Sequence, residues 1–181
     1  MKKFYKVLTI ALCAAMLVAG SIAGTLAYLS MKTETKANTF TAGDINIELK
    51  QNTALDTSKM VPGKTYMVDP VVTVKANSED CWLFIKIEKT ANFDTFLNYE
   101  MATGWTLLED GVYYREVGAT ATDTDFTVIK ENTVTADTNR TKEDYNDLTA
   151  NLDLKFTAYA VQREGFDDKA DAWTVAQELD S

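Results

Sequence analysis

The sequence predicts an all-β fold: an antiparallel, jelly-roll-like β-sandwich with a few short helices, one of them at the C-terminus. Apolar and polar residues alternate with a period of two in several segments, turn signals separate those segments, and helical spacing is confined to three short stretches. The 181-residue chain has no internal repeat, no low-complexity tract and only two prolines. A single folded domain without a linker is therefore expected.

The first half of the chain contains three strand patterns separated by turns. Ile45, Ile47 and Leu49 share one face of the first pattern, over residues 44–49, and polar residues occupy the other face. The sequence Val61-Pro62-Gly63-Lys64 predicts a turn, because proline presets φ at its second position and glycine accepts a positive φ at its third. A second strand is expected over residues 71–75. A turn over residues 77–80 then leads into a third strand over residues 81–88.

The third strand is apolar on both faces. Cys81, Leu83, Ile85 and Ile87 face one way, whereas Trp82 and Phe84 face the other. The outer face of a sandwich is normally polar, so these two aromatic residues allow two interpretations. They lie beneath a helix, for instance against Trp173, or they form an exposed aromatic patch for a partner or a glycan.

A hairpin is expected in the second half, where Asp110-Gly111 separates the strand patterns 105–109 and 112–116. The Asp-Gly pair favours a type I′ turn. Shorter strands are expected over residues 126–129 and 133–135, and a long one follows from Leu152 to Val161. The predicted core comprises Ile45, Ile47, Leu83, Ile85, Leu154 and Phe156.

Helical spacing occurs in three places. Residues 93–97 form a short turn, and residues 141–148 are a weaker candidate. Ala170, Trp173 and Ala176 mark one stripe of a C-terminal helix. Asp167 and Asp168 stand at its start, where acidic residues are favourable.

The N-terminus has the parts of a signal peptide. Lys2, Lys3 and Lys6 precede an uncharged apolar run that ends in small residues. Thr25 and Ala27 suit a peptidase cut between Ala27 and Tyr28. An uncleaved membrane anchor is the alternative, because the run is long enough to span a bilayer with roughly 20 residues. A lipid-modified Cys13 is disfavoured, because Cys13 lies mid-run after the bulky Leu12.

Removal of the signal makes the chain strongly acidic. It takes away three lysines and no acid, so the net charge changes from −9 to −12. Such a surface repels nucleic acid and anionic membranes. Cys81 is then the single cysteine, so no internal disulfide can form and the domain depends on its hydrophobic core. We expect three parts: the signal peptide 1–27, an extended arm 28–38 and one β-sandwich domain 39–181.

Several motifs resemble the TasA/camelysin family, exported proteins of Firmicutes that are processed by the dedicated signal peptidase SipW. They are the run Gly24-Thr25-Leu26-Ala27-Tyr28-Leu29-Ser30, the charged arm, and Asn38-Thr39-Phe40-Thr41-Ala42-Gly43 before an alternating strand. The Val61-Pro62-Gly63-Lys64 turn and the tail around Ala158-Tyr159-Ala160-Val161 are also similar. The resemblance is specific over about 50 N-terminal residues and rests on pattern alone in the middle.

The resemblance implies a jelly-roll matrix protein whose N-terminal segment adds as a strand to the next subunit of an extracellular fibre. An open sandwich leaves unpaired strand edges, and an extended arm satisfies them. The arm is rich in threonine and has no proline or glycine; an ordinary flexible tail is the alternative interpretation. The expected assembly residues are Tyr28, Leu29, Ser30, Met31, Thr33 and Thr35.

Catalysis is not expected, although camelysin, a member of the resembled family, carries the label of a metalloprotease. The chain has no histidine, which excludes an HExxH zinc site and any Ser-His or Cys-His nucleophile pair. Cys81 is interpreted as a buried structural thiol. Paired carboxylates suffice for a glycosidase, but each candidate group is explained by a turn, a loop or a helix start. These groups are Glu109/Asp110, Asp123/Asp125 and Asp167/Asp168/Asp171.

The sequence therefore favours an exported structural protein of the cell surface or biofilm matrix of a Gram-positive bacterium. Its expected partners are copies of itself or related matrix proteins, with a signal peptidase during export. It needs no cofactor, binds no nucleic acid, and touches the membrane only through the signal segment before cleavage. A monomeric surface-binding module or adhesin is the main alternative, and a camelysin-like secreted hydrolase ranks below both.

Overall fold

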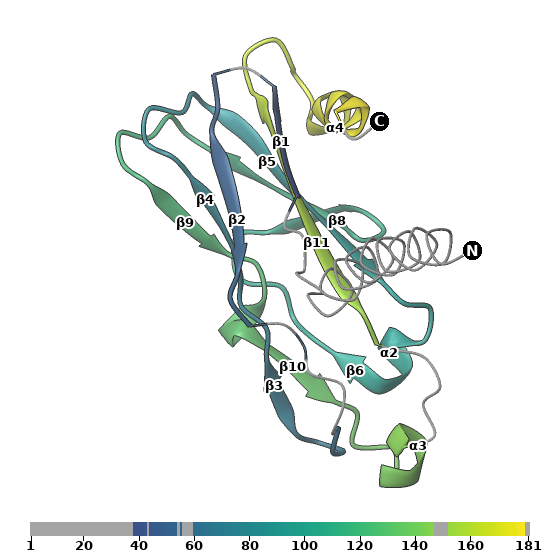
Figure 1. Cartoon of the computed structure of the whole chain (residues 1–181). Helices are drawn as coiled ribbons and strands as arrows, with labels where there is room; N and C mark the ends of the chain where they lie inside the picture. Colours follow the sequence, from purple (N-terminus) through teal and green to yellow (C-terminus); the bar gives the residue numbers. More distant parts are fainter. Residues whose placement is uncertain (1–37, 43, 54, 56–59, 147–151, 180–181) are drawn as a thin grey trace, which may run out of the picture. The chain divides into compact units, whose positions relative to one another are not determined.

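The computed structural model describes residues 38–42, 44–53, 55, 60–146 and 152–179 (Figure 1). These residues form strands in mainly antiparallel sheets with few short helices, which confirms the predicted all-β class. The jelly-roll connectivity stays a prediction. The signal segment, its cleavage site at Ala27 and Tyr28, and the arm up to residue 37 lie outside the described residues. No described helix is long and apolar enough to span a membrane.

A five-stranded sheet runs through the middle of the domain. In spatial order it consists of β1 (Asn38–Ala42), β11 (Leu154–Gln162), β5 (Cys81–Lys89), β8 (Val112–Val117) and β7 (Thr106–Glu109). All its pairs are antiparallel except the first, in which β1 runs parallel to β11 from Asn38 opposite Thr157 to Ala42 opposite Val161. The sequence pattern does not identify β1, because the segment 38–42 lacks a clear alternation of apolar and polar residues.

Two three-stranded sheets complete the domain (Figure 1). One has the order β2 (Ile47–Gln51), β4 (Pro70–Val74) and β9 (Thr124–Thr127). The other has the order β3 (Thr65–Met67), β10 (Thr133–Ala136) and β6 (Leu97–Asn98). The short helices of the described residues are α2 (Phe93–Phe96), the 3-10 turn Lys130–Asn132, α3 (Lys142–Asn146) and α4 (Lys169–Glu178). All three predicted helical stretches therefore contain a helix.

The main core lies between the five-stranded sheet and the sheet of β2, β4 and β9. Inward residues of β5 and β11 meet inward residues of β2 and β4, so two layers bury one another. Every residue of the predicted core is at most 8% exposed. Those residues are Ile45, Ile47, Leu83, Ile85, Leu154 and Phe156.

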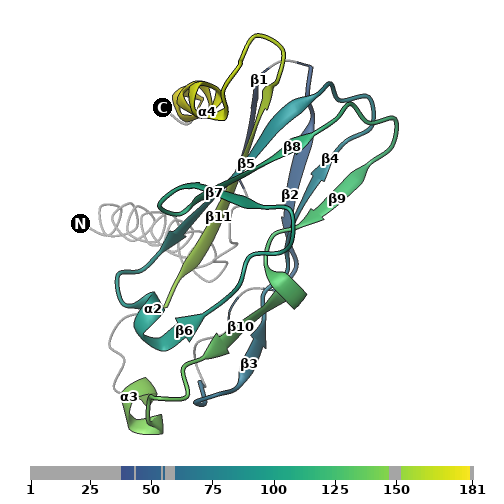
Figure 2. The ribbon, with the colours of Figure 1, turned by 180° about the vertical axis from the view of Figure 1, so that it is seen from behind.

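A second core lies on the outer face of the five-stranded sheet, beneath α4 (Figure 2). The Trp173 ring packs 5.2 Å from the ring centres of both Phe84 and Tyr159. Its indole Nε1 donates a hydrogen bond of 2.6 Å to Glu109 Oε1. Trp82 and Phe84 are thus buried under a helix, as the first of the two interpretations predicted, and they form no exposed aromatic patch.

The turns confirm most of the predicted local chemistry. Lys64 N donates to Val61 O, and Gly63 has φ +72°, as the proline-glycine turn requires. The hairpin between β7 and β8 is present, but the predicted type I′ geometry is wrong. Gly111 has φ +73°, whereas Asp110 is absent from the residues with positive φ. A register shift between Leu107 and Glu109 provides the extra bend that a type I′ turn would otherwise supply.

Candidate functional site

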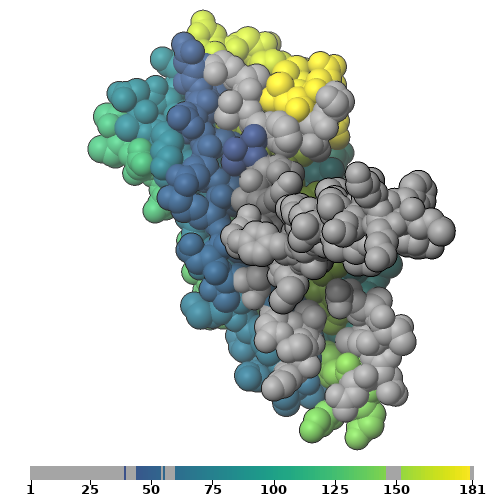
Figure 3. Space-filling view, viewed as in Figure 1, coloured from purple at the N-terminus to yellow at the C-terminus, as the bar shows by residue number. Residues whose placement is uncertain are grey.

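Free strand edges are the first candidate feature, because they are where another chain can add. Within the described residues, β1 and β7 form the edges of the five-stranded sheet, while β2 and β9 form the edges of the facing sheet. β1 also follows the proposed arm directly in the sequence, since Asn38 is its first residue. Residues of β2 and, further down, β3 lie exposed along the face shown in Figure 3. None of the predicted assembly residues 28–35 is described.

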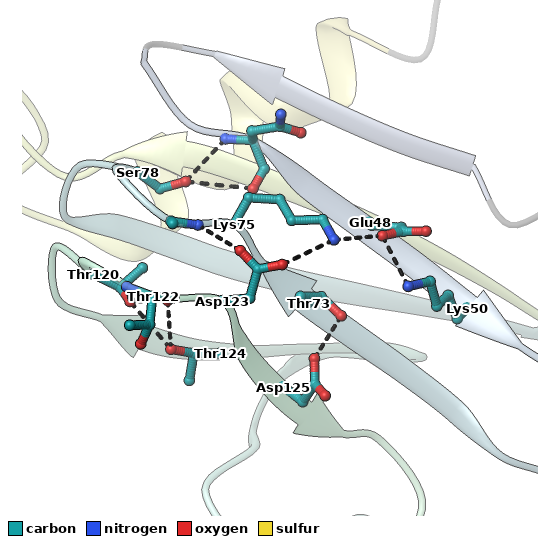
Figure 4. Close-up of polar contacts among 12 residues, drawn as sticks. Glu48, Lys50, Thr73, Lys75, Ser78, Thr120, Thr122, Asp123, Thr124 and Asp125 are labelled. Atoms are coloured by element: carbon teal, nitrogen blue, oxygen red, sulfur yellow. Dashed lines mark hydrogen bonds and ion pairs between the residues drawn. The ribbon is translucent and has the colours of Figure 1, made fainter.

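The second candidate is a charged network on the outer face of the sheet formed by β2, β4 and β9 (Figure 4). Glu48, Thr73 and Asp125 lie opposite one another on the three strands. Thr73 Oγ1 donates a hydrogen bond of 2.6 Å to Asp125 Oδ1. Beside this row, Lys75 Nζ is 2.6 Å from Glu48 Oε2 and 3.2 Å from Asp123 Oδ2.

The electrostatics of this network are those of ion pairs at a surface. Hydrogen bonds to Glu48 and Asp123 raise the pKa of Lys75, and the bond from Lys75 lowers the pKa of Glu48. The hydrogen bond from the Ala76 backbone N–H lowers the pKa of Asp123, and the bond from Lys75 adds to this effect. All these groups therefore stay charged near neutral pH and are poorly suited to proton transfer. The network ties β2, β4 and the turn before β9 together.

Two of the remaining carboxylate candidates, Glu109 and Asp168, are also held in structural contacts. Glu109 accepts the hydrogen bond from Trp173. Asp168 caps α4 by accepting a bond of 2.7 Å from the Ala170 backbone N–H, and Asp171 lies in the first turn of that helix. The described residues contain no group of three or more side chains able to hold a metal ion. The paired-carboxylate patterns thus correspond to a turn, a surface network and a helix cap.

Cys81 has the properties of a structural thiol. Its side chain is 0% exposed at the start of β5. Burial, with a smaller contribution from the neighbouring Asp80 carboxylate, raises the pKa of the thiol to about 12. The nucleophilic thiolate is therefore scarce at neutral pH, as expected for a small apolar core residue.

A shallow hollow of about 340 Å³ lies at the end of the domain where β5 begins and β11 ends. It is lined by charges of both signs that already pair with one another. Arg163 lies 3.5 Å from Asp80 and 3.2 Å from Glu116. Its cation is therefore neutralised from within the chain, which leaves little attraction for an outside anion.

Arg115 of β8 has no such partner among the described residues, and sequence reasoning did not identify it. It stacks with Phe126, its guanidinium carbon 4.0 Å from the ring centre, and with Trp105 at 5.4 Å. Its Nε atom is buried without a hydrogen-bond partner. The alternation of β8 places Arg115 on the inward face, where a charged residue is unusual. This unusual position is the sequence feature that could have identified Arg115.

Comparison with known proteins finds one family. Residues 3–76, fewer than half of the 181 residues, match the family model described as camelysin metallo-endopeptidase. The match covers the predicted signal segment and arm together with β1, β2, β3 and β4, and it confirms the resemblance drawn from the N-terminal motifs. No curated protein and no solved structure matches the chain.

Proposed function

From the premise that this is an exported protein of the TasA/camelysin family, we propose that it is a structural subunit of a cell-surface or biofilm-matrix fibre. The subunits assemble when the N-terminal arm of one copy adds as a strand to the next copy. The observation that best supports this proposal is the position of β1. It lies at the edge of the central sheet, directly after the arm in the sequence, and it pairs in parallel with β11.

The parallel pairing of β1 is informative for physical reasons. The other described strand pairs are antiparallel, and parallel neighbours require a long connection along the chain. β1 is therefore joined to its neighbour β11 through most of the domain and not through a hairpin. In the proposed assembly, the residues that precede β1 pair with the free edge of another copy.

The two alternatives are supported less well. An exposed aromatic patch at Trp82 and Phe84 would have favoured the adhesin alternative, but both side chains are buried in the core beneath α4. The hydrolase alternative has the family name in its favour, yet the chain contains no histidine for an HExxH site. We therefore propose a non-enzymatic role without a cofactor, outside the cell, with copies of this chain or related matrix proteins as partners.

Electron microscopy of the secreted protein tests the proposal. We expect filaments from the protein with its arm, and only monomers from a variant that lacks residues 28–37. The deletion stops before Asn38 so that β1 is kept. A matched control replaces the same residues by a Gly/Ser segment of equal length, which retains the tether but not the side chains. Filaments that persist in both variants would refute strand donation.

A further inference from the structure

Arg115 lacks a counter-ion in an acidic protein. The chain carries 27 acidic and 18 basic residues. Many described basic side chains form an ion pair with a carboxylate, for instance Lys75 with Glu48 and Lys89 with Asp94. Within the part of the chain that the structure describes, the Arg115 side chain takes part in no ion pair and no hydrogen bond, and it stacks on two aromatic rings.

The guanidinium is also held in one place. Phe126 lies against it at 4.0 Å, and Trp105 is itself fixed by a hydrogen bond of 2.9 Å from its Nε1 to Thr127 O. Gly104 closes a third side: with φ +93°, a Cβ added there would lie 2.8 Å from Arg115 Nη2. Any side chain at position 104 would therefore displace the guanidinium. An immobilised planar fork is well suited to a carboxylate, because little rotamer entropy is lost on binding.

Stacking alone explains only part of this arrangement. An arginine at the edge of the core is stabilised by contact between the flat faces of its guanidinium and the aromatic rings. The N–H donors, however, lie in the plane of the guanidinium, where ring faces do not satisfy them. Burial lowers the pKa of Arg115, yet the group stays protonated at neutral pH. A partly buried cation whose Nε donor has no partner favours an anion.

Two unpaired strand edges lie beside Arg115. β7 pairs with β8 only as far as Thr106 opposite Tyr114, so the described part of β8 from Arg115 to Val117 pairs with β5 alone. β9 pairs with β4 alone among the described strands. The contact between Phe126 of β9 and Arg115 of β8 places these edges on the same side of the sandwich. Although Thr127 O already accepts the bond from Trp105, strand edges without a second strand partner beside a cation favour a peptide in extended form over a small anion.

We propose that Arg115 and the adjoining edges of β8 and β9 bind an extended peptide through a carboxylate, and that the occupant is the arm of a second copy, with Glu34 as the anchor. This inference rests on the proposed fibre assembly and identifies its acceptor site. Glu34 is the single acidic residue among the first 43, and it lies in the sequence Thr33-Glu34-Thr35. Threonine on both sides favours extended backbone.

A second copy is the better source of the arm because the backbone between Glu34 and β1 is short. β1 is separated from β8 by β11 and β5, three strand spacings of about 4.8 Å or roughly 14 Å in all. Glu34 precedes Asn38 by four residues, which span at most about 14 Å when fully extended. The chain would be used up in crossing the sheet and would have no length left to lie along β8. An arm from another copy does not have to cross this sheet, and we therefore assign the carboxylate to a second copy.

A peptide titration tests the site without altering the protein. The secreted protein, labelled with ¹⁵N, is titrated with a synthetic peptide of residues 28–37 while the Nε–H resonance of Arg115 is followed by NMR. The resonance is assigned from the Arg115→Lys variant. We expect saturable movement with the native peptide, and binding about tenfold or more weaker with a Glu34→Gln peptide. Equal binding of the two peptides, or equal movement with the same concentration of acetate, would overturn the proposal.

A charge exchange in the full secreted chain tests the same pair in assembly. We expect Glu34→Lys and Arg115→Glu each to reduce the sedimenting polymer, and the two together to restore it. Glu34→Lys leaves the sequence of every described strand unchanged, so its effect does not depend on the stability of the Arg115 variant.

The two proposals fail in different ways. Polymer that forms normally with Glu34→Lys would overturn the Arg115 site and leave fibre assembly standing. Absence of polymer from the unaltered protein would refute fibre assembly, and the peptide titration would still decide whether Arg115 binds a carboxylate.

Discussion

Replacement of Phe84 by Ala tests whether α4 is an integral layer of the domain. Phe84, Ile85 and Lys86 are consecutive residues of β5, so Phe84 and Lys86 share the outer face while Ile85 faces the main core. Phe84 and Ile85 are both 0% exposed, whereas Lys86 is partly exposed. An uncovered outer face would make Phe84 and Lys86 similarly tolerant of substitution. A face covered by α4 makes Phe84 behave like Ile85.

The structure sets the magnitudes. Phe84→Ala empties a fully buried aromatic site and should reduce the free energy of unfolding by about 3–5 kcal/mol. Ile85→Ala should reduce it by about 2–5 kcal/mol. Lys86→Ala should change it by no more than about 0.5 kcal/mol. The ring contact at 5.2 Å between Phe84 and Trp173 should couple these two residues by about 0.5–1.5 kcal/mol.

Urea unfolding at equilibrium measures these quantities, because the midpoint and slope give the free energy for each variant. A double-mutant cycle of Phe84→Ala with Trp173→Ala isolates the coupling between helix and sheet. If Phe84→Ala were as mild as Lys86→Ala and additive with Trp173→Ala, α4 would not be packed on the sheet in solution. The second core described above would then be wrong.

Three further predictions concern separate parts of the chain. Gly111→Ala should lower the melting temperature measurably, because φ is +73° and the new Cβ would lie 2.8 Å from a backbone oxygen, whereas Gly118→Ala, with its nearest contact at 3.8 Å, should have little effect. Cys81 should resist alkylation at pH 8 in the folded protein and react in urea. Burial raises the pKa of the folded thiol to about 12, so the unfolded chain releases this proton at a lower pH than the folded chain. The free energy of unfolding should therefore fall as pH rises above about 8.5. N-terminal sequencing of the secreted protein should begin at Tyr28 or within a few residues, and recovery of intact Met1 in the membrane fraction would indicate an anchor instead.

The strands of the core were predictable because burial imposes a period of two on them. Leu83 and Ile85 in β5 and Leu154 and Phe156 in β11 alternate with residues of the other face, and all four are buried. The second core was predictable in outline for a related reason. Trp82 and Phe84 on an outer face require a cover, and a C-terminal stripe containing Trp173 is the available helix.

Other features could not be read from local patterns. The segment Asn38–Ala42 becomes a strand only because the edge of β11 is there to receive it, and that edge lies more than a hundred residues away in the sequence. Arg115 is surrounded by Trp105 and Phe126, which come from different segments, so its stacking appears only in three dimensions. The turn at Asp110-Gly111 was predicted by residue type, whereas its geometry was decided by the adjacent register shift.

Two deletions test the boundary between the proposed arm and the domain, because one of them keeps β1 and the other removes it. Deletion of residues 28–37 leaves β1 in place and should not change the melting temperature of the monomer. Deletion through Ala42 removes the five residue pairs between β1 and β11. At about 0.5–1.5 kcal/mol for each main-chain hydrogen bond, the loss amounts to about 2.5–7.5 kcal/mol, or a fall of about 5–30 °C in the melting temperature. If both deletions melted like the intact chain, β1 would contribute nothing to the monomer, and its segment would belong to the donated strand.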